Sequence, residues 1–170
     1  MDKFVALAKQ AVEKYVKTGK VMAVPSDLPA EFLSKAGVFV TIKKNNELRG
    51  CVGTYLPTKE NLAQEIISSA IAACAYDGRF YPVGEEELPD LNYEVSILSP
   101  PQKIETLKNH NPKKHGLIVA SSDGRRGLLL PDLEGVDTVE DQINIACQKG
   151  GIDPLEDEIE YYSFTVEKHI

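Results

Sequence analysis

The chain has 170 residues, 42% of them hydrophobic and 26% charged, which is typical of an ordinary globular domain and not of a disordered or fibrous protein. Its formal net charge of -7 disfavours nucleic-acid binding, because clustered Lys and Arg side chains are what bind phosphates. No apolar run approaches the roughly 20 residues of a membrane span, and three well-separated cysteines predict reduced thiols in a cytoplasmic protein rather than a secreted disulfide framework.

The first predicted element is an amphipathic helix. Asp2 can cap it, apolar residues recur at helical spacing as far as Val16, and Gly19 can end it. A β-branched run over 38–42 follows, and Asn45-Asn46 predicts a turn into a second strand. The sequence therefore predicts a helix and then a β-hairpin.

A second helix is expected after the hairpin, capped by Thr58 and carrying an apolar stripe from Leu62 to Cys74. The residues 91–97 then alternate between apolar and polar, which predicts a strand halted by Pro100-Pro101.

The second half of the chain repeats this plan. Strands are expected over 117–120 and 128–130, separated by an Asp123-Gly124 turn. Thr138 with Asp141 can cap a helix, and alternation of aromatic and aliphatic residues over 162–166 predicts a last strand. An Arg-Gly step also occurs in the second strand of each half.

These elements predict an α+β fold in a single domain, 1–170, with structural halves at roughly 1–100 and 101–170. Each half is β-β-α-β-like. We expect the halves to form a mainly antiparallel, curved sheet that is covered by helices, with a groove between the halves.

The segment Leu48-Arg49-Gly50-Cys51-Val52-Gly53 is the strongest candidate site. In a strand, Arg49 and Cys51 would share one face, and an adjacent guanidinium favours a reactive thiolate. Gly50 and Gly53 would let a ligand approach closely. The alternative is a structural hairpin in which Cys51 is a small buried hydrophobe.

Further residues are candidates for lining the groove. Arg79 and Phe80 follow the second helix beside Asp77, and two guanidinium groups would suit a carboxylate or phosphate ligand. Glu94 and Ser96 lie on the polar side of their predicted strand. The alternatives are a helix stop complemented by an arginine, and a solvated strand face.

His115 heads the second predicted hairpin, where it could approach Cys51 across the groove and act as its base. The alternative is a loop histidine bonded to backbone. No metal-ligand spacing, nucleotide-binding loop or other cofactor motif is present, so no metal and no cofactor is predicted.

Several of these motifs together resemble the AMMECR domain, the AMME syndrome candidate gene family, whose bacterial members are called AmmeMemoRadiSam system protein A. The matching segments run in order along the chain. They include Gly37–Ile42, Leu48–Gly53, Ala72-Ala73, Asp77–Phe80, Glu87-Leu88, Glu94–Ser99, His115–Val119, Leu129–Pro131 and Cys147–Gly151. The resemblance implies a compact α+β domain with a cleft near the Arg-Gly-Cys segment, and an association with a Memo-like protein and a radical-SAM protein.

Two functions remain open from the sequence. In the first, a groove lined by Arg49, Cys51, Arg79 and His115 binds or acts on a small anionic or thiol-reactive ligand, with Cys51 as nucleophile in the stronger form. In the second, the chain is a non-catalytic adaptor for the Memo-like and radical-SAM proteins, with an apolar surface patch and a buried Cys51.

Overall fold

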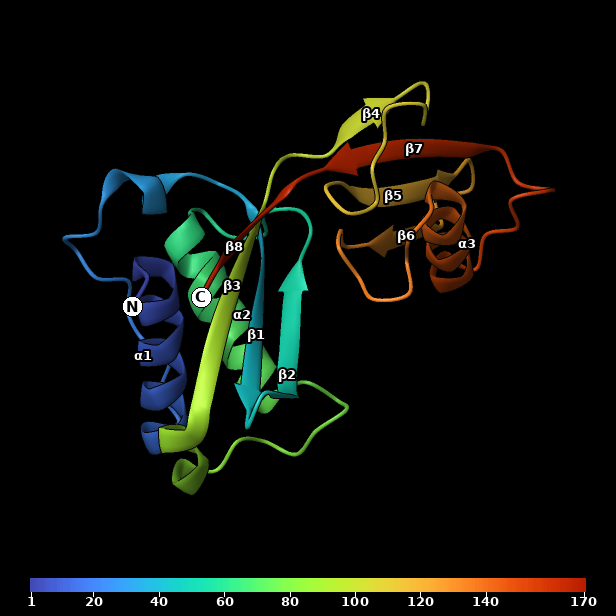
Figure 1. The fold of residues 1–170 in the computed structure, drawn as a ribbon. Coiled ribbons are helices and arrows are strands. Elements are labelled where there is room, and N and C mark those ends of the chain that lie inside the picture. Colours follow the sequence, from blue (N-terminus) through green and yellow to red (C-terminus); the bar gives the residue numbers. More distant parts are fainter. The chain divides into compact units, whose positions relative to one another are not determined.

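The computed structural model describes residues 1–170, which fold into two compact units. Unit 1 comprises Met1–Leu98 with Glu167–Ile170, and unit 2 comprises Ser99–Val166. Each unit holds one four-stranded sheet, in the orders β2-β1-β3-β8 and β4-β7-β5-β6 (Figure 1). The α+β class is confirmed, with the strands divided between two sheets rather than joined in one curved sheet.

Unit 1 contains most of the helical residues. Its elements are α1 (Lys3–Thr18), the 3-10 helix η1 (Ala30–Leu33), β1 (Gly37–Lys44), β2 (Glu47–Thr54), α2 (Leu62–Ala75), the 3-10 helix η2 (Glu85–Asp90), β3 (Leu91–Leu98) and β8 (Val166–His169). Both α1 and α2 lie on the same side of the sheet (Figure 1).

The cap of α1 is the one predicted from the sequence. The Asp2 carboxylate accepts hydrogen bonds from the backbone N–H groups of Phe4 and Val5, and Gly19 ends the helix in the left-handed conformation. The predicted cap of α2 is wrong. Asn61 caps that helix, and Thr58 instead donates two hydrogen bonds to the carboxylate of Glu65.

The hairpin of unit 1 turns at Asn45 and Asn46, as expected. Both residues have positive φ, 52° and 65°, which asparagine tolerates better than most residues. The register is regular except at one position: Lys43 pairs with Leu48 and Ile42 pairs with Gly50, so Arg49 is the extra residue of a β-bulge.

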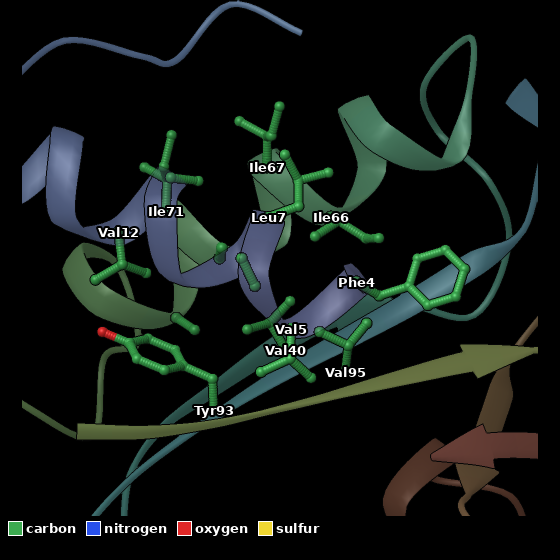
Figure 2. Packing of buried hydrophobic residues seen from close by; sticks show 14 of the residues in the cluster. Phe4, Val5, Leu7, Val12, Val40, Ile66, Ile67, Ile71, Tyr93 and Val95 are labelled. Carbon is green, nitrogen blue, oxygen red and sulfur yellow. The ribbon is translucent and has the colours of Figure 1, made fainter. Parts of the chain in front are cut away.

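The core of unit 1 lies between the two helices and the sheet (Figure 2). Its labelled members include Val5 and Val12 from α1, Ile66 from α2, and Val40 and Val95 from the sheet. All five are buried, because the helical stripe and the alternate strand residues face each other.

Unit 2 has its own smaller core around Leu117, Val119, Ala146 and Cys147. Its elements are β4 (Gln102–Ile104), β5 (Gly116–Ser121), β6 (Arg126–Leu129), α3 (Val139–Gly150) and β7 (Ile159–Phe164). Thr138 and Asp141 form the predicted capping box of α3.

The predicted repeat of β-β-α-β elements is confirmed at the level of topology. The elements β1-β2-α2-β3 of unit 1 correspond to β5-β6-α3-β7 of unit 2, and the strand orders β2-β1-β3 and β6-β5-β7 match. The Arg-Gly steps also correspond. A Cβ atom would lie 2.1 Å from the Ala73 carbonyl oxygen at Gly50, and 1.7 Å from that of Ala146 at Gly127.

Two strand predictions differ from the structure. The last strand, expected to run through 162–166, is interrupted at Thr165, so β7 pairs in the second sheet while β8 joins the first. The chain therefore returns to unit 1, and the unit boundaries differ from the expected halves 1–100 and 101–170. The short strand β4 was not predicted, because three residues after two prolines carry no periodic signal.

None of the helices combines the length and apolar character needed to cross a bilayer.

Candidate functional site

The candidate residues on β2 and β3 divide between the two faces of the sheet. Gly50 faces α2, since only the absence of its side chain allows the close approach of Ala73. Alternation then places Cys51 on the face opposite α2, beside its pairing partner Thr41. Gly50 is therefore a packing residue between strand and helix and not part of a ligand groove.

Four predicted residues share this face opposite α2. Cys51, Thr41 and Glu94 form one cross-strand row, because Thr41 pairs with both of the others. Gly53 and Ser96 both pair with Phe39, and these three residues form the next cross-strand row. A Cβ atom at Gly53 would lie 2.0 Å from the Val38 carbonyl oxygen and 2.7 Å from Cγ of the Phe39 ring, so this position needs glycine.

The thiol of Cys51 is half-buried, and its Sγ lies 3.2 Å from Oγ1 of Thr41. Cys74 and Cys147 are fully buried in the two cores. Burial raises the pKa of the Cys74 thiol to about 11, so that group stays protonated near neutral pH. Only Cys51 among the three cysteines is accessible to a reagent.

Glu94 in the same row is paired with Lys43, whose ammonium group donates to its carboxylate. Glu94 is mostly buried, and Ser96 is buried. The polar character that the sequence predicts for this face is therefore present, but its charges are compensated within the sheet.

The guanidinium of Arg49 is bound to Glu87 and to the loop that follows α2. Its Nε and Nη2 donate to the two carboxylate oxygens of Glu87 at 3.0 and 2.8 Å. Its Nη1 and Nη2 donate to the carbonyls of Tyr81 and Pro82 at 3.0 and 3.4 Å. None of these hydrogen bonds of Arg49 reaches Cys51, and the influence of the Arg49 charge on the Cys51 thiol stays a prediction.

Glu87 is the partner that the sequence analysis did not select. Its carboxylate also accepts from Lys44 at 3.1 Å and from the Gly84 N–H at 3.0 Å. These hydrogen bonds, led by those of Arg49, lower the pKa of Glu87 to about 2 despite partial burial. The available signal was its place in the Glu87-Leu88 step of the family pattern.

Asp77 and Arg79 lie beside the outer edge of β2. The Asp77 carboxylate accepts from the Cys51 N–H at 2.9 Å, and Arg79 Nη2 donates to the Cys51 carbonyl at 3.2 Å. Since β2 is an edge strand, these bonds satisfy backbone groups that would otherwise be unpaired. The two residues thus hold the backbone of Cys51 from outside the sheet.

Asp77 and Arg79 also form a two-bond ion pair, with Nε–Oδ1 and Nη2–Oδ2 distances of 3.0 and 2.7 Å. The hydrogen bonds from Arg79 hold the pKa of the buried Asp77 carboxyl well below its usual value. The Arg79 side chain itself remains 57% exposed.

An open cavity of about 640 Å³ adjoins these residues, and we call it the Arg79 cavity. It is lined by Arg49, Gly78, Arg79, Phe80 and Tyr81. The guanidinium carbons of Arg79 and Arg49 lie 5.5 and 6.0 Å from the centre of the Phe80 ring. Tyr81 is 91% exposed, so its ring is free to contact a ligand.

His115 belongs to unit 2, whereas Cys51 belongs to unit 1. The Nδ1 atom of His115 accepts a hydrogen bond from the Asn111 N–H at 3.1 Å. This bond agrees with the loop-histidine alternative, and a pairing of His115 with Cys51 stays a prediction.

Within the whole described chain, no group of three or more His, Cys, Asp or Glu side chains is arranged to hold a metal ion. Apart from Gly50, which packs on α2, the predicted site residues occupy three places: the sheet face with Cys51, the Arg79 cavity with its neighbour Asp77, and the His115 region of unit 2.

Comparison with known proteins identifies the family. A family model described as AMMECR1 matches residues 5–169. A protein of Thermotoga maritima is 51% identical over 168 residues, which cover 98% of this chain and 96% of that protein. Protein CA_C1420 of Clostridium acetobutylicum is 43% identical over 98% of this chain, which spans only 34% of that longer protein.

A solved structure gives the same result. The crystal structure of the uncharacterised protein PH0010 from Pyrococcus horikoshii is similar to this chain, with a TM-score of 0.87 and 37% sequence identity. The match covers 97% of this chain and 88% of the Pyrococcus chain. The family model, the curated relatives and this crystal structure agree, so the chain belongs to the AMMECR1 family.

Proposed function

We propose that the chain binds a small anionic ligand in the Arg79 cavity. The observation that carries the proposal is an exposed guanidinium that is fixed in direction by a buried carboxylate, at the wall of a cavity with two aromatic side chains. Such an arrangement suits a carboxylate or phosphate group, because the arginine is already oriented before the ligand arrives.

The charges around the cavity support this choice of ligand. Of the five residues that line the cavity, two are cations, Arg49 and Arg79, and none is acidic. Arg49 uses four hydrogen bonds to hold the loop, whereas Arg79 keeps more than half of its side chain in solvent. Arg79 is therefore the proposed anion-binding residue, and Arg49 supports the cavity wall.

The role of Cys51 as a nucleophile is the finer form of the proposal. Its support is that Cys51 is the most accessible cysteine and that Arg79 holds its carbonyl. Its thiol, however, lies with Thr41 on the sheet face and does not line the cavity. Binding of an anion is thus the better supported activity, and a reaction at sulfur requires a ligand that extends from the cavity to that face.

The test uses inorganic phosphate as the probe and NMR spectra that resolve the Arg79 Nε–H signal. We expect that signal to shift saturably with phosphate and not with sodium chloride at equal ionic strength. Arg79→Gln should weaken binding at least about tenfold, since one hydrogen bond to a charged group contributes roughly 1.5–3 kcal/mol.

Arg126→Gln is the matched control, because Arg126 is an exposed arginine of unit 2 whose loss changes the net charge equally. If both variants weaken binding to the same extent, the effect is one of overall charge and the proposed site is wrong. Cys51→Ala should leave phosphate binding unchanged, and a loss of binding in that variant would assign the anion to the sheet face instead.

The second candidate function is a non-catalytic adaptor for a Memo-like and a radical-SAM protein in the cytoplasm. One observation favours it: a cavity of about 420 Å³ on the outer side of α2 is lined mainly by apolar side chains, among them Val21, Met22, Ile67, Ile71 and Tyr76. Proteins that associate with partners often expose such patches.

The length of the Clostridium acetobutylicum relative supports the same candidate, because the sequence matched by this chain is only about a third of that polypeptide. A domain that works together with other proteins is a natural candidate for such fusion.

Affinity purification of the chain from its host, with Val21→Asp and Cys51→Ala variants, separates the two functions, since Val21 lines this cavity and is 64% exposed. The adaptor function predicts that Val21→Asp releases the Memo-like and radical-SAM proteins while Cys51→Ala retains them. Retention of both partners by the Val21→Asp variant would exclude this surface as the adaptor site.

A further inference from the structure

A third cavity, within unit 2, lies around His115, and we call it the His115 cavity. It has a volume of about 410 Å³, which is in the range of small-molecule sites. Its polar lining residues are Ser99, Gln102, His115, Ser163 and Thr165, and its apolar ones are Pro100, Ile104 and Phe164.

His115 is held in a fixed orientation by hydrogen bonds on three of its atoms. Its backbone N–H donates to the Asn111 carbonyl at 2.7 Å, and its ring Nδ1 accepts from the Asn111 N–H at 3.1 Å. Its backbone carbonyl accepts from Nε2 of Gln142 at 2.9 Å. The ring position is therefore set by groups outside the cavity.

Gln142 anchors this arrangement from the interior. Its side chain is 0% exposed, and its Oε1 lies 2.7 Å from Nε2 of His110. Because the Gln142 amide nitrogen donates to His115, the amide oxygen must accept from His110. Both ends of the Gln142 amide are hydrogen-bonded, which offsets the free-energy cost of burying it and fixes its position between the two histidines.

The protonation of the His115 ring follows from the same bonds. Since Nδ1 accepts a hydrogen bond it carries no proton, so the proton of the neutral ring is on Nε2. Nε2 of His115 makes no hydrogen bond within the protein. The ring thus presents an unused N–H donor in a residue that lines the cavity.

Hydroxyl groups supply further donors. Oγ of Ser99 accepts from the Thr165 N–H at 2.8 Å, so its own proton remains free to donate. Ser163 and Thr165 each add a hydroxyl, and Gln102 adds an amide. No Asp or Glu lines the cavity, so no carboxylate in its wall repels an anion.

We propose that the His115 cavity is a separate binding site for a small organic oxyanion, a phosphate or carboxylate with an apolar part. The imidazole Nε2–H and the serine and threonine hydroxyls bind the oxyanion, and Pro100, Ile104 and Phe164 contact the apolar part. This binding site is separate from the anion site that we propose in the Arg79 cavity, and neither proposal depends on the other.

The test is a titration of the whole chain with phenyl phosphate, followed by NMR of ring-¹⁵N-labelled histidines. The chain has three histidines, so each ring can be assigned. We expect the Nε2 signal of His115 to shift saturably, with tighter binding than for inorganic phosphate. His169 belongs to unit 1 and should not shift.

His115→Gln should weaken binding of phenyl phosphate about tenfold or more, as expected for one hydrogen bond to a charged group. Ser163→Ala should weaken it severalfold, while Ser122→Ala, an exposed serine of the same unit, should not. The serine pair keeps the test valid if His115→Gln does not fold.

Three results would overturn the proposal: no saturable shift at His115, an equal shift with benzyl alcohol in place of phenyl phosphate, or an equal effect of both serine variants. Arg79→Gln should leave this titration unchanged. The outcome at the Arg79 cavity therefore does not decide the outcome here.

Discussion

At the scale of single residues, the two arginines near Cys51 have different tasks. Arg49 is almost fully used in holding the loop after α2, whereas Arg79 is anchored by Asp77 and stays exposed. Unit 2 has a parallel case. Arg125 donates to Asp157 at 2.7 Å and to the Gly151 carbonyl, both in the segment after α3. A hairpin arginine that ties down the post-helix segment thus occurs in both units.

We predict that Cys51 is the first cysteine alkylated by iodoacetamide in the folded protein. Cys51 is half-buried, while Cys74 and Cys147 are enclosed in the two cores and react only after opening of the structure. Peptide mass spectrometry over a time course checks the order. Equal rates at all three cysteines would contradict the half-buried placement of Cys51.

We predict that Arg49→Ala lowers the free energy of unfolding by about 2–3 kcal/mol, because Glu87 is left partly buried without its main partner. Urea denaturation measures the change. Lys9→Ala is the control, since the Lys9–Glu13 pair lies on the surface of α1 with a 3.8 Å separation and should cost less than about 0.5 kcal/mol. Similar losses in both variants would mean that the Arg49–Glu87 pair has no special structural role.

At the scale of elements, the same contact between strand and helix is made twice. Gly50 of β2 packs on Ala73 of α2, and Gly127 of β6 packs on Ala146 of α3. A cysteine follows each of these alanines and is buried in the corresponding core. The Arg-Gly step is therefore a packing feature of both units. What unit 2 lacks is a cysteine after the glycine: Cys51 follows Gly50 in β2, whereas Leu128 follows Gly127 in β6.

We predict that Gly50→Ala and Gly127→Ala each destabilise the protein by more than about 2 kcal/mol or prevent folding, because a methyl group would overlap a helix carbonyl. Thermal unfolding followed by circular dichroism measures the effect. Gly78→Ala is the matched control, with no atom within 4 Å of its added Cβ, and it should be neutral or stabilising by less than about 1 kcal/mol. A normal melting curve for Gly50→Ala would refute the close strand–helix contact.

At the scale of the whole molecule, each unit has its own sheet and its own core. Within unit 1, three carboxylates with lowered pKa values hold segments of the chain in place through hydrogen bonds. Glu87 holds the loop 81–87 to β2, and Asp77 holds the backbone of Cys51. Glu65 is a buried carboxylate of α2 that holds Thr58 and Lys59; burial opposes its ionisation, but hydrogen bonds from both residues lower its pKa. Because their pKa values are lowered by folding, protonating these carboxylates at low pH decreases the free energy of unfolding.

We predict that the free energy of unfolding decreases as the pH falls from about 4.5 toward 2. The folded pKa of Glu87, about 2, lies below the unfolded value of roughly 4.3, so its contribution is complete above the unfolded value and lost on acidification. Glu87→Gln should be less stable at pH 7 by at most about 3 kcal/mol and should show a flatter acid profile. Urea titrations at several pH values check this, and parallel profiles for the two proteins would exclude Glu87 as a source of the acid dependence.

The sequence predicted most of the elements, because their signals are local. The Asp2 cap and Gly19 end of α1, the Asn45-Asn46 turn and the Thr138 capping box all depend on residues within a few positions of each other. The repeated β-β-α-β order was also readable, since hydrophobic period and turn residues recur in both halves.

The site was predicted only in part. Glu94 and Ser96 were correctly placed together on one side of their strand, because strand alternation is a local rule, but their sharing a sheet face with Cys51 was not predicted. The direction of Arg49 was not predictable, since it depends on a bulge and on a carboxylate in a distant loop.

The sequence by itself determined the family pattern, the α+β class and the elements of each half, since these follow from motifs, periodicity and caps. The tertiary structure decided that Arg79 stays exposed at the cavity while Glu87 binds Arg49 in its wall, that β8 returns to the first sheet, and that Gln142 orients His115. Those outcomes depend on contacts between residues far apart in the chain, and such contacts are set by packing and hydrogen-bond satisfaction over the whole fold rather than by neighbouring residues.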